Sequence, residues 1–378
     1  MFQSPDRRNT DSVKWGLFEE DVLPLWVADM DFTSPPAVIE ALHQRVAHGV
    51  FGYALDFKEL KELVVARMEL LYGWEITPDD ILLVPGVVSG FNLTCQAVTQ
   101  PGESILLQPP VYPPFFEAPV KAGARAVYNN IQPGADGNYR VDLDAFSSAV
   151  EADTRALLLC NPHNPLGRVF SREELSGMAE CCLRHEMVII ADEIHSDLVY
   201  SGYQHIPIAS LDKEVAASTV TLIAPSKTFN IAGLDCSILI CQNRDLKKRI
   251  KEARRGLMGG VNLLGMTAAE AAYRDGTSWL IEVLTYLEAN RDHLMTYLNE
   301  KLPAIHMVKP EATYLAWLDC RDLGLEIPPC EHFHARARVA LNDGRDFGEP
   351  GNGFVRLNFG CSREMLDEAL ERMRRSLD

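Results

Sequence analysis

Residues 156–195 read ALLLCNPHNPLGRVFSREELSGMAECCLRHEMVIIADEIH, and the order of apolar and polar segments in them indicates the fold class. Two short apolar runs, Ala156–Cys160 and Val188–Ala191, enclose Ser171–His185, a segment of helical length and periodicity. That segment opens with a serine and, three residues later, a glutamate, which is the spacing of a capping box. This part of the chain therefore predicts a strand, a helix and a second strand.

The same alternation extends outward on both sides of these residues. Further apolar runs of strand length, separated mainly by segments of helical length, occur at Ile81–Val84, Ser104–Leu107, Val220–Ala224 and Ser237–Cys241. Strands that alternate with helices form mostly parallel sheets whose faces the helices cover. We therefore expect an α/β fold with a large domain, in which helices flank a mostly parallel sheet.

The last third of the chain has a different pattern. Ser278–Lys301 is periodic enough to form one long helix, and strand-like runs at Thr313–Leu318 and Gly353–Leu357 precede a final helix that Ser362 would cap. This pattern predicts a smaller α+β domain. The expected division is an N-terminal segment, residues 1–45, that packs with the small domain, a large domain, residues 46–280, and the small domain, residues 281–378.

The charge of the chain excludes several classes of partner. Its 378 residues include 36 lysines and arginines against 53 aspartates and glutamates, a formal charge of −17. This is the wrong sign for binding nucleic acid or an anionic membrane surface. No uninterrupted apolar stretch approaches membrane-spanning length, and residues 1–11 lack the apolar core of a signal peptide, so we expect a cytoplasmic protein.

The cysteines and histidines give little support for a disulfide framework or a metal site. The nine cysteines are scattered without C-x-x-C spacing, and we expect them to be reduced and mostly buried. Residues 330–334, CEHFH, gather metal-ligating side chains, but no second pair follows at zinc spacing. The sequence therefore predicts no metal.

Reactive residue types follow three of the apolar runs, where open α/β sheets bind their ligands. Asp192 comes directly after Val188–Ala191, Lys227 lies in PSKTFN after Val220–Ala224, and Asn164 lies in NPHNP after Ala156–Cys160. Taken singly, these residues could be a helix cap, a solvated loop lysine and a structural turn. Together they supply an amine, an anion and an amide donor, which are the groups that pyridoxal chemistry requires.

The motifs around these residues identify a family. In chain order they are NPHNPLG at 161–167, DEIH at 192–195, PSKTFN at 225–230 and FVRLN at 354–358. This order resembles the class I/II aminotransferase superfamily, fold type I of the enzymes that depend on pyridoxal 5′-phosphate (PLP). The chain is most similar to the cystathionine β-lyase branch, the MalY/PatB-like C–S lyases, on the segments WVADMDF at 26–32, HGVFGY at 48–53, APSKTFN at 224–230 and TYLAWL at 313–318.

The resemblance implies a PLP-transferase fold and a role for each residue around the cofactor ring. Lys227 would hold PLP as a Schiff base and later remove the Cα proton of the substrate. Asp192 would pair with the pyridinium nitrogen, and Asn164 would donate to the ring hydroxyl. His195, one helical turn past Asp192, would contact the same edge, and Tyr112 would stack on the ring.

The resemblance also implies how phosphate and substrate are bound. The main-chain amides of Val87 and Val88 at a helix start and the Ser226 hydroxyl would bind the phosphate. Tyr53 would reach it from a neighbouring subunit, which implies a homodimer with shared active sites. Asn164 and Arg356 would bind the substrate, with the Arg356 fork on its α-carboxylate. Many aminotransferases carry an arginine eight residues after the lysine, whereas this chain has Asp235 there.

Three functions are compatible with these residues. The branch implies β-elimination from cystathionine or a cysteine S-conjugate, which yields a thiol, pyruvate and ammonia. The alternative is aminotransfer of a small amino acid, which uses the same residues. A further alternative is a regulatory protein with the same fold that binds a transcription factor through its acidic surface.

Overall fold

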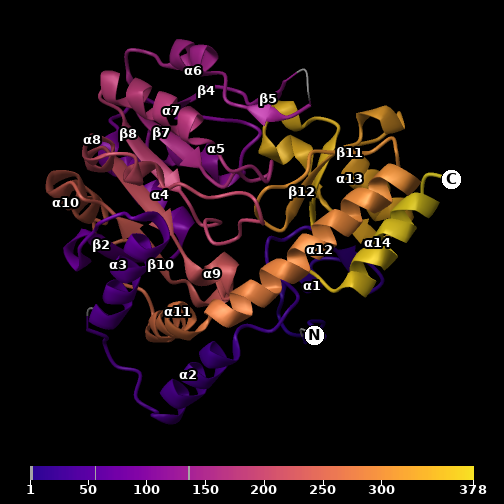
Figure 1. Ribbon diagram of the computed structural model, residues 1–378, viewed down its shortest axis with the longest axis horizontal. Helices are drawn as coiled ribbons and strands as arrows, with labels where there is room; N and C mark the ends of the chain where they lie inside the picture. The colour runs from indigo at the N-terminus through magenta and orange to yellow at the C-terminus, as the bar shows by residue number, and fades with distance from the viewer. Residues whose placement is uncertain (1–2, 56, 135–136) are drawn as a thin grey trace.

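The computed structural model describes residues 3–55, 57–134 and 137–378. Its central sheet has seven strands in the order β2-β10-β9-β8-β7-β3-β4 (Figure 1). The strands from β9 to β4 run parallel to one another, and β10 is antiparallel to both of its neighbours. This confirms the mostly parallel sheet. The strands are β2 (Ile81–Val84), β3 (Ser104–Leu107), β4 (Arg125–Tyr128), β7 (Thr154–Cys160), β8 (Val188–Asp192), β9 (Thr219–Ile223) and β10 (Ser237–Ile240).

The sequence did not indicate the edge strand β4. Of its four residues only Val127 is buried, while Arg125 and Tyr128 are exposed. An edge strand that faces solvent on most of its length has no apolar run to mark it. The six other strands of this sheet match the predicted runs to within two residues at each end.

Helices cover both faces of the sheet. One layer contains α4 (Val87–Val98), α5 (Pro114–Lys121) and α10 (Arg244–Ala253), and the other contains α6 (Leu143–Ala149) and α7 (Arg172–Arg184). Successive side chains of a strand point to opposite layers, so Leu158 packs with the first layer whereas Leu157 and Leu159 pack with the second. The capping box predicted at the start of α7 is present.

The C-terminal part has its own sheet. Its four antiparallel strands follow the order β11-β12-β15-β14, and the long helix α12 and the final helix α14 pack beside it (Figure 1). These elements are β11 (His306–Met307), β12 (Leu315–Asp319), β14 (Asn342–Asp343), β15 (Phe354–Asn358), α12 (Thr277–Lys301) and α14 (Arg363–Arg375). The predicted long helix is confirmed, and so is the Ser362 cap, whose hydroxyl accepts a hydrogen bond from the Met365 amide.

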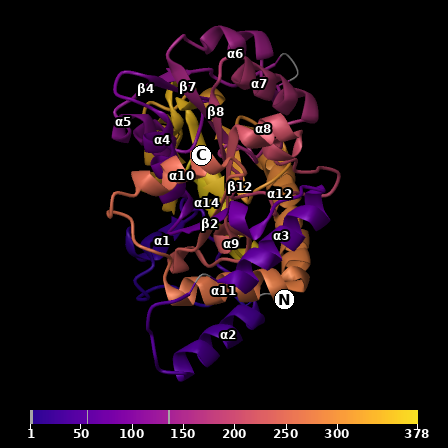
Figure 2. The ribbon, with the colours of Figure 1, turned by 90° about the vertical axis from the view of Figure 1, so that its left-hand side faces the viewer.

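The N-terminal segment reaches both parts of the molecule. Its strand β1 (Leu23–Pro24) pairs in parallel with β13 (Val339–Ala340), next to the small sheet. Its helix α2 (Pro36–Ala47) extends to the other end of the molecule and packs on α11 (Leu263–Asp275) (Figure 2). The domain boundary expected at residue 280 falls within the first turn of α12, and the division into domains stays a prediction.

The other elements are short or lie around the two sheets. They are α1 (Val13–Gly16), β1 (Leu23–Pro24), α2 (Pro36–Ala47), α3 (Lys58–Tyr72), β5 (Gln132–Pro133), β6 (Tyr139–Arg140), α8 (Lys213–Ala217), α9 (Pro225–Thr228), α11 (Leu263–Asp275), α13 (Pro329–His332) and β13 (Val339–Ala340). Within the described ranges, no helix combines the length and the apolar character that crossing a membrane requires.

Candidate active site

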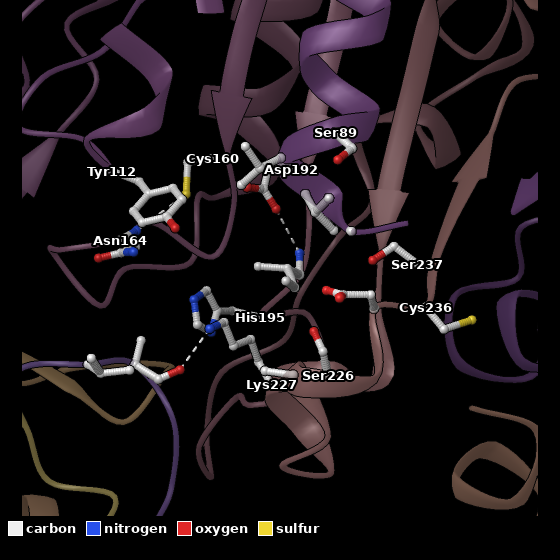
Figure 3. Close-up of a pocket in the computed structure, with 18 of the residues that line it drawn as sticks. Ser89, Tyr112, Cys160, Asn164, Asp192, His195, Ser226, Lys227, Cys236 and Ser237 are labelled. Atoms are coloured by element: carbon white, nitrogen blue, oxygen red, sulfur yellow. Dashed lines mark hydrogen bonds between the residues drawn. The ribbon is translucent and has the colours of Figure 1, made fainter. Parts of the chain in front are cut away.

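A cavity of about 460 Å³ opens where the parallel strands of the central sheet end. β7, β8 and β9 run in the same direction, so the loops that follow them meet at one edge of the sheet. Nine of the ten site residues expected from the sequence line this cavity, namely Val87, Val88, Tyr112, Asn164, Asp192, His195, Ser226, Lys227 and Arg356. Figure 3 shows Tyr112 and Asn164 on one side, Ser89 and Ser237 on the other, and Asp192 and Lys227 between them.

Lys227 lies in α9, a single helical turn that begins directly after β9. Its Nζ donates a hydrogen bond of 2.7 Å to the carbonyl oxygen of Ala28 (Figure 3). Burial lowers the pKa of Lys227 to about 8, although the charges of Asp29 and Asp192 act in the opposite direction. A lysine with such a pKa is partly neutral near pH 8, and its amine can then act as a nucleophile and as a base.

Asp192 is the last residue of β8 and is buried. Burial raises its pKa to about 7, while a hydrogen bond of 3.1 Å from the Ile194 amide and the charge of Lys227 oppose the rise. This carboxyl group is the one anionic side chain that lies at the end of β8 inside the cavity, so it is poised to pair with a cationic group of a ligand.

Arg356 extends from β15 of the small sheet into the same cavity and is buried. Its guanidinium donates to the side-chain oxygens of Asn164, at 3.0 Å, and Asn342, at 2.6 Å, and to the Trp26 carbonyl oxygen, at 2.9 Å. Its Nε has no hydrogen-bond partner among the described residues. Burial lowers the pKa of Arg356 to about 10, and its three hydrogen-bond partners are neutral groups. A buried cation with neutral partners is suited to bind a carboxylate.

His195 lies in a turn and not, as expected, one helical turn past Asp192. The amide of Ser196 donates to the Glu193 carbonyl oxygen, and that of Leu198 donates to the His195 carbonyl oxygen, so the chain reverses in tight turns of three-residue spacing. The imidazole still reaches the cavity and packs edge-on against Tyr314 with 6.2 Å between ring centroids. Burial, and then the charges of Lys227 and Arg356, lower the pKa of His195 to about 3, so it is neutral at physiological pH.

An anion subsite is formed where β2 leads into α4. Gly86 caps the helix with a φ of +95°, a conformation that glycine adopts without strain. The first amides of a helix have no intrahelical acceptor, and those of Val87, Val88 and Ser89 therefore favour an anion here. The Ser226 residue also lines this cavity, and so does the exposed Asp235.

Tyr53 is the predicted site residue that lies outside the cavity. Its side chain is fully exposed, at 109 %, and it lines a second hollow together with Phe51 and Leu55. Within one chain, Tyr53 is therefore not part of the site. Among the described residues, those of 330–334 included, no three or more His, Cys, Asp or Glu side chains are grouped so that they could hold a metal ion.

The cavity also contains groups that the sequence did not single out. Trp26, Val27 and Ala28 form part of its lining, and Asn342 holds the guanidinium of Arg356. The segment containing residues 26–28 stood out only by its resemblance, because a backbone carbonyl leaves no signal in residue type. Asn342 lies in a strand of two residues, which is too short to show a pattern.

The combination of these groups fits PLP. The cavity holds an amine that can bind an aldehyde, a buried carboxyl group for the ring nitrogen, an aromatic side chain, Tyr112, and a helix start for the phosphate. It also holds the Arg356 guanidinium, whose hydrogen-bond partners are neutral and which can bind the carboxylate of an amino acid. These groups come from both sheets, so the site exists only when the large and small parts are folded together.

Comparison with known proteins agrees with this arrangement. The family model described as aminotransferase class I and II matches residues 20–373. Cystathionine beta-lyase PatB of Bacillus subtilis is 41% identical over 98% of either chain. A cystathionine beta-lyase of Corynebacterium glutamicum is 38% identical over 97% of this chain and 96% of its own. The crystal structure of cystalysin from Treponema denticola, which contains PLP, superimposes with a TM-score of 0.95 at 32% identity and covers 100% of this chain and 98% of its own.

Proposed function

The chain belongs to the family of class I and II aminotransferases, and from this membership we propose that it is a PLP-dependent C–S β-lyase of the cystathionine β-lyase type. Its substrate would be cystathionine or a cysteine S-conjugate, and its products a thiol, pyruvate and ammonia. The observation that carries the PLP-dependent chemistry, which β-elimination and aminotransfer share, is one cavity in which Lys227, with its pKa lowered to about 8, lies with Asp192 and Arg356. The names of the two similar cystathionine β-lyases support the same reaction.

The cofactor would be held by residues at the ends of five strands of the central sheet, β2, β3, β7, β8 and β9. Lys227 would bind its aldehyde, Asp192 its ring nitrogen, and the helix start at Val87 and Val88, with Ser226, its phosphate. The Asn164 oxygen accepts a hydrogen bond from Arg356, so its amide nitrogen is the group left to donate to the ring hydroxyl. Tyr112 and His195 would contact the ring, and His195 would do so as a neutral group.

The chain's own residues account for binding and proton transfer. The guanidinium of Arg356 would bind the α-carboxylate of the substrate and orient its Cα. When bound, PLP supplies an electron sink for the negative charge left on Cα after the proton is removed. Lys227 would take that proton once the substrate amine has replaced its nitrogen at the aldehyde carbon, and its lowered pKa permits this near neutral pH. The Cβ–S bond then breaks with its electron pair on sulfur, and hydrolysis of the released enamine gives pyruvate and ammonia.

A direct assay tests the proposal. Purified protein loaded with PLP is incubated with cystathionine and with S-alkyl cysteines, without any keto acid, and pyruvate and free thiol are measured. We expect equal amounts of both products, and none from Lys227→Ala. The matched control is Lys213→Ala, since Lys213 is an exposed lysine of α8. A requirement for a keto acid acceptor, with no pyruvate from cystathionine alone, would contradict the lyase and favour aminotransfer.

We further propose a homodimer in which Tyr53 completes the phosphate subsite of the partner subunit. The exposed Tyr53 has exposed apolar neighbours, Val50, Phe51 and Leu55, and such a patch on a monomer is typical of an interface. The cytoplasmic location also stays a prediction, which cell fractionation can check.

A further inference from the structure

The segment Trp26–Phe32 forms part of the cavity wall, and side chains of the active site bind its backbone. The carbonyl oxygen of Trp26 accepts from Arg356, and that of Ala28 accepts from both Lys227, at 2.7 Å, and Tyr314, at 3.0 Å. Both cations of the site therefore donate hydrogen bonds to this one segment. Asn358 and Asn230 hold the rest of it through the carbonyl oxygens of Val27, Asp29, Met30 and Phe32.

The same segment carries two carboxylates that pair with cations of the N-terminal residues. Nζ of Lys14 lies 2.7 Å from Oδ2 of Asp31 and 3.5 Å from Oδ1 of Asp29, and it also donates to the Asp29 carbonyl oxygen at 3.2 Å. Arg7 binds Asp29 at 2.6 Å and Asp31 at 2.8 Å. Trp15 donates its indole N–H to Asp31. Two cations and two anions thus balance in one cluster.

Lys14 is the deepest member of this cluster. Its side chain is 0 % exposed, whereas that of Arg7 is 21 % exposed. A buried ammonium is stable only while its counter-charges are in place, so Lys14 ties the positions of Asp29 and Asp31 to that of the helical turn α1, in which it lies. The Trp26–Phe32 segment carries both carboxylates, so it can move little without breaking their ion pairs with Lys14.

The balance of charge in the cluster also reaches Lys227. The charged groups that act on the Lys227 amine are Asp29, Arg356 and Asp192. Of these three groups, Asp29 belongs to the cluster, and the positive charges of Arg7 and Lys14 partly offset its negative charge. Removing one of these cations would expose Lys227 to a stronger negative charge, which favours its protonated form.

We propose that Lys14 is a positioning residue for the active site: through Asp29 and Asp31 it holds the Trp26–Phe32 segment beside the Lys227 amine and the Arg356 guanidinium. This inference rests on the proposed function. Lys14 touches neither substrate nor cofactor, and its effect passes through the wall that binds both active-site cations.

The test uses the PLP-loaded protein and the variant Lys14→Met, which keeps the length of the side chain and removes its charge. The first readout needs no substrate: it is the pH midpoint of the change in cofactor absorbance as the nitrogen contributed by Lys227 titrates. We expect this midpoint to rise by about one pH unit, because the cluster is left with an excess negative charge. The second readout is kcat/KM, which should fall on the order of tenfold to a hundredfold, mainly through KM, because the wall is displaced.

Two further variants separate positioning from folding. Lys121→Met is the matched control, since Lys121 is exposed and pairs with Glu117 on the surface, and it should leave both readouts at the wild-type values. The double variant Lys14→Met with Asp31→Asn restores the charge balance, with Arg7 and Asp29 as the remaining pair. It should therefore return the midpoint toward the wild-type value while KM stays raised.

A folded Lys14→Met protein with unchanged midpoint and unchanged KM overturns the proposal. If Lys14→Met does not fold, the double variant provides the test, and a wild-type KM in the double variant also overturns the proposal. The midpoint is read without substrate, so it remains informative if the protein proves not to cleave C–S bonds. In that case KM is measured for the amino acid that the loaded enzyme does process.

Discussion

Asp192→Asn should stabilise the cofactor-free protein at alkaline pH while it abolishes catalysis. The Asp192 carboxyl group is buried at the end of β8, and the amide of Ile194 is its hydrogen-bond donor. Its pKa rises from an ordinary value of 3.8 to about 7, with burial as the largest cause. Folding at pH 8 therefore forces a charge into an apolar environment, and an asparagine of nearly the same shape carries no such charge.

The sign and the size of the effect follow from the two pKa values. Below pH 3.8 the group is protonated in the folded and the unfolded protein. Between pH 3.8 and about 7 only the folded protein keeps the proton, so the free energy of unfolding falls as the pH rises and levels off above 7. A shift of about three pKa units corresponds to about 4 kcal/mol in total, of which about 3 kcal/mol is lost between pH 5 and pH 8.

Urea unfolding of the cofactor-free proteins at pH 5 and at pH 8 measures this change. The gain of Asp192→Asn over the wild type should grow by about 3 kcal/mol between the two pH values. The control is Asp319→Asn, because Asp319 is partly buried, yet its contacts with Arg321 outweigh burial and lower its pKa. Its effect should be a loss of the same size at both pH values. A gain for Asp192→Asn that does not change with pH would refute the reasoning.

Three other experiments test the remaining parts of the site. Arg356→Lys keeps the cation but loses the planar fork, so kcat/KM should fall on the order of a hundredfold, mainly through KM; an unchanged KM would argue against a role in carboxylate binding. Gly86→Ala places a Cβ where φ is +95°, and the strain at the start of α4 should raise the Kd for PLP, measured by fluorescence quenching, about tenfold. Lys227→Ala and Tyr53→Ala, each inactive or weak alone, should recover up to about a quarter of the wild-type activity when mixed, because half the chains then form dimers with one intact site. No recovery on mixing would contradict a shared site.

Residue type and position in the chain were sufficient to predict the centre of the site. Asp192 and Lys227 each follow an apolar run that is buried on both faces of the sheet, and parallel strands necessarily bring such ends together. The chemistry of the site needs a carboxyl group and an amine, which few other side chains can supply. Such residues are visible in a single sequence because their neighbours are so uniformly apolar.

The groups that hold these residues could not be predicted in the same way. Ala28 contributes only its carbonyl oxygen, which every residue type has, and the partners of Lys14, Asp29 and Asp31, lie 15 and 17 residues away along the chain. The path of the chain after Asp192 was also wrong in the prediction, since tight turns replaced a helical one around His195. Local backbone hydrogen bonds determine the conformation of such a turn, and the pattern of side chains in the sequence does not predict them.

Burial acts on Lys227, Arg356 and Asp192 at the centre of the site in the same sense. It lowers the pKa values of Lys227 and Arg356 and raises that of Asp192, so each group is pushed toward its neutral form. Burying these groups lowers the free energy of unfolding of the empty site. A ligand that carries the complementary charges offsets part of this loss. In the proposed function, a carboxylate bound at Arg356 and a protonated ring nitrogen bound at Asp192 would be such charges. Binding of cofactor and substrate should therefore raise the free energy of unfolding. Because the empty site is destabilised by its buried charges, an amino acid with a free α-carboxylate should bind in preference to one without it.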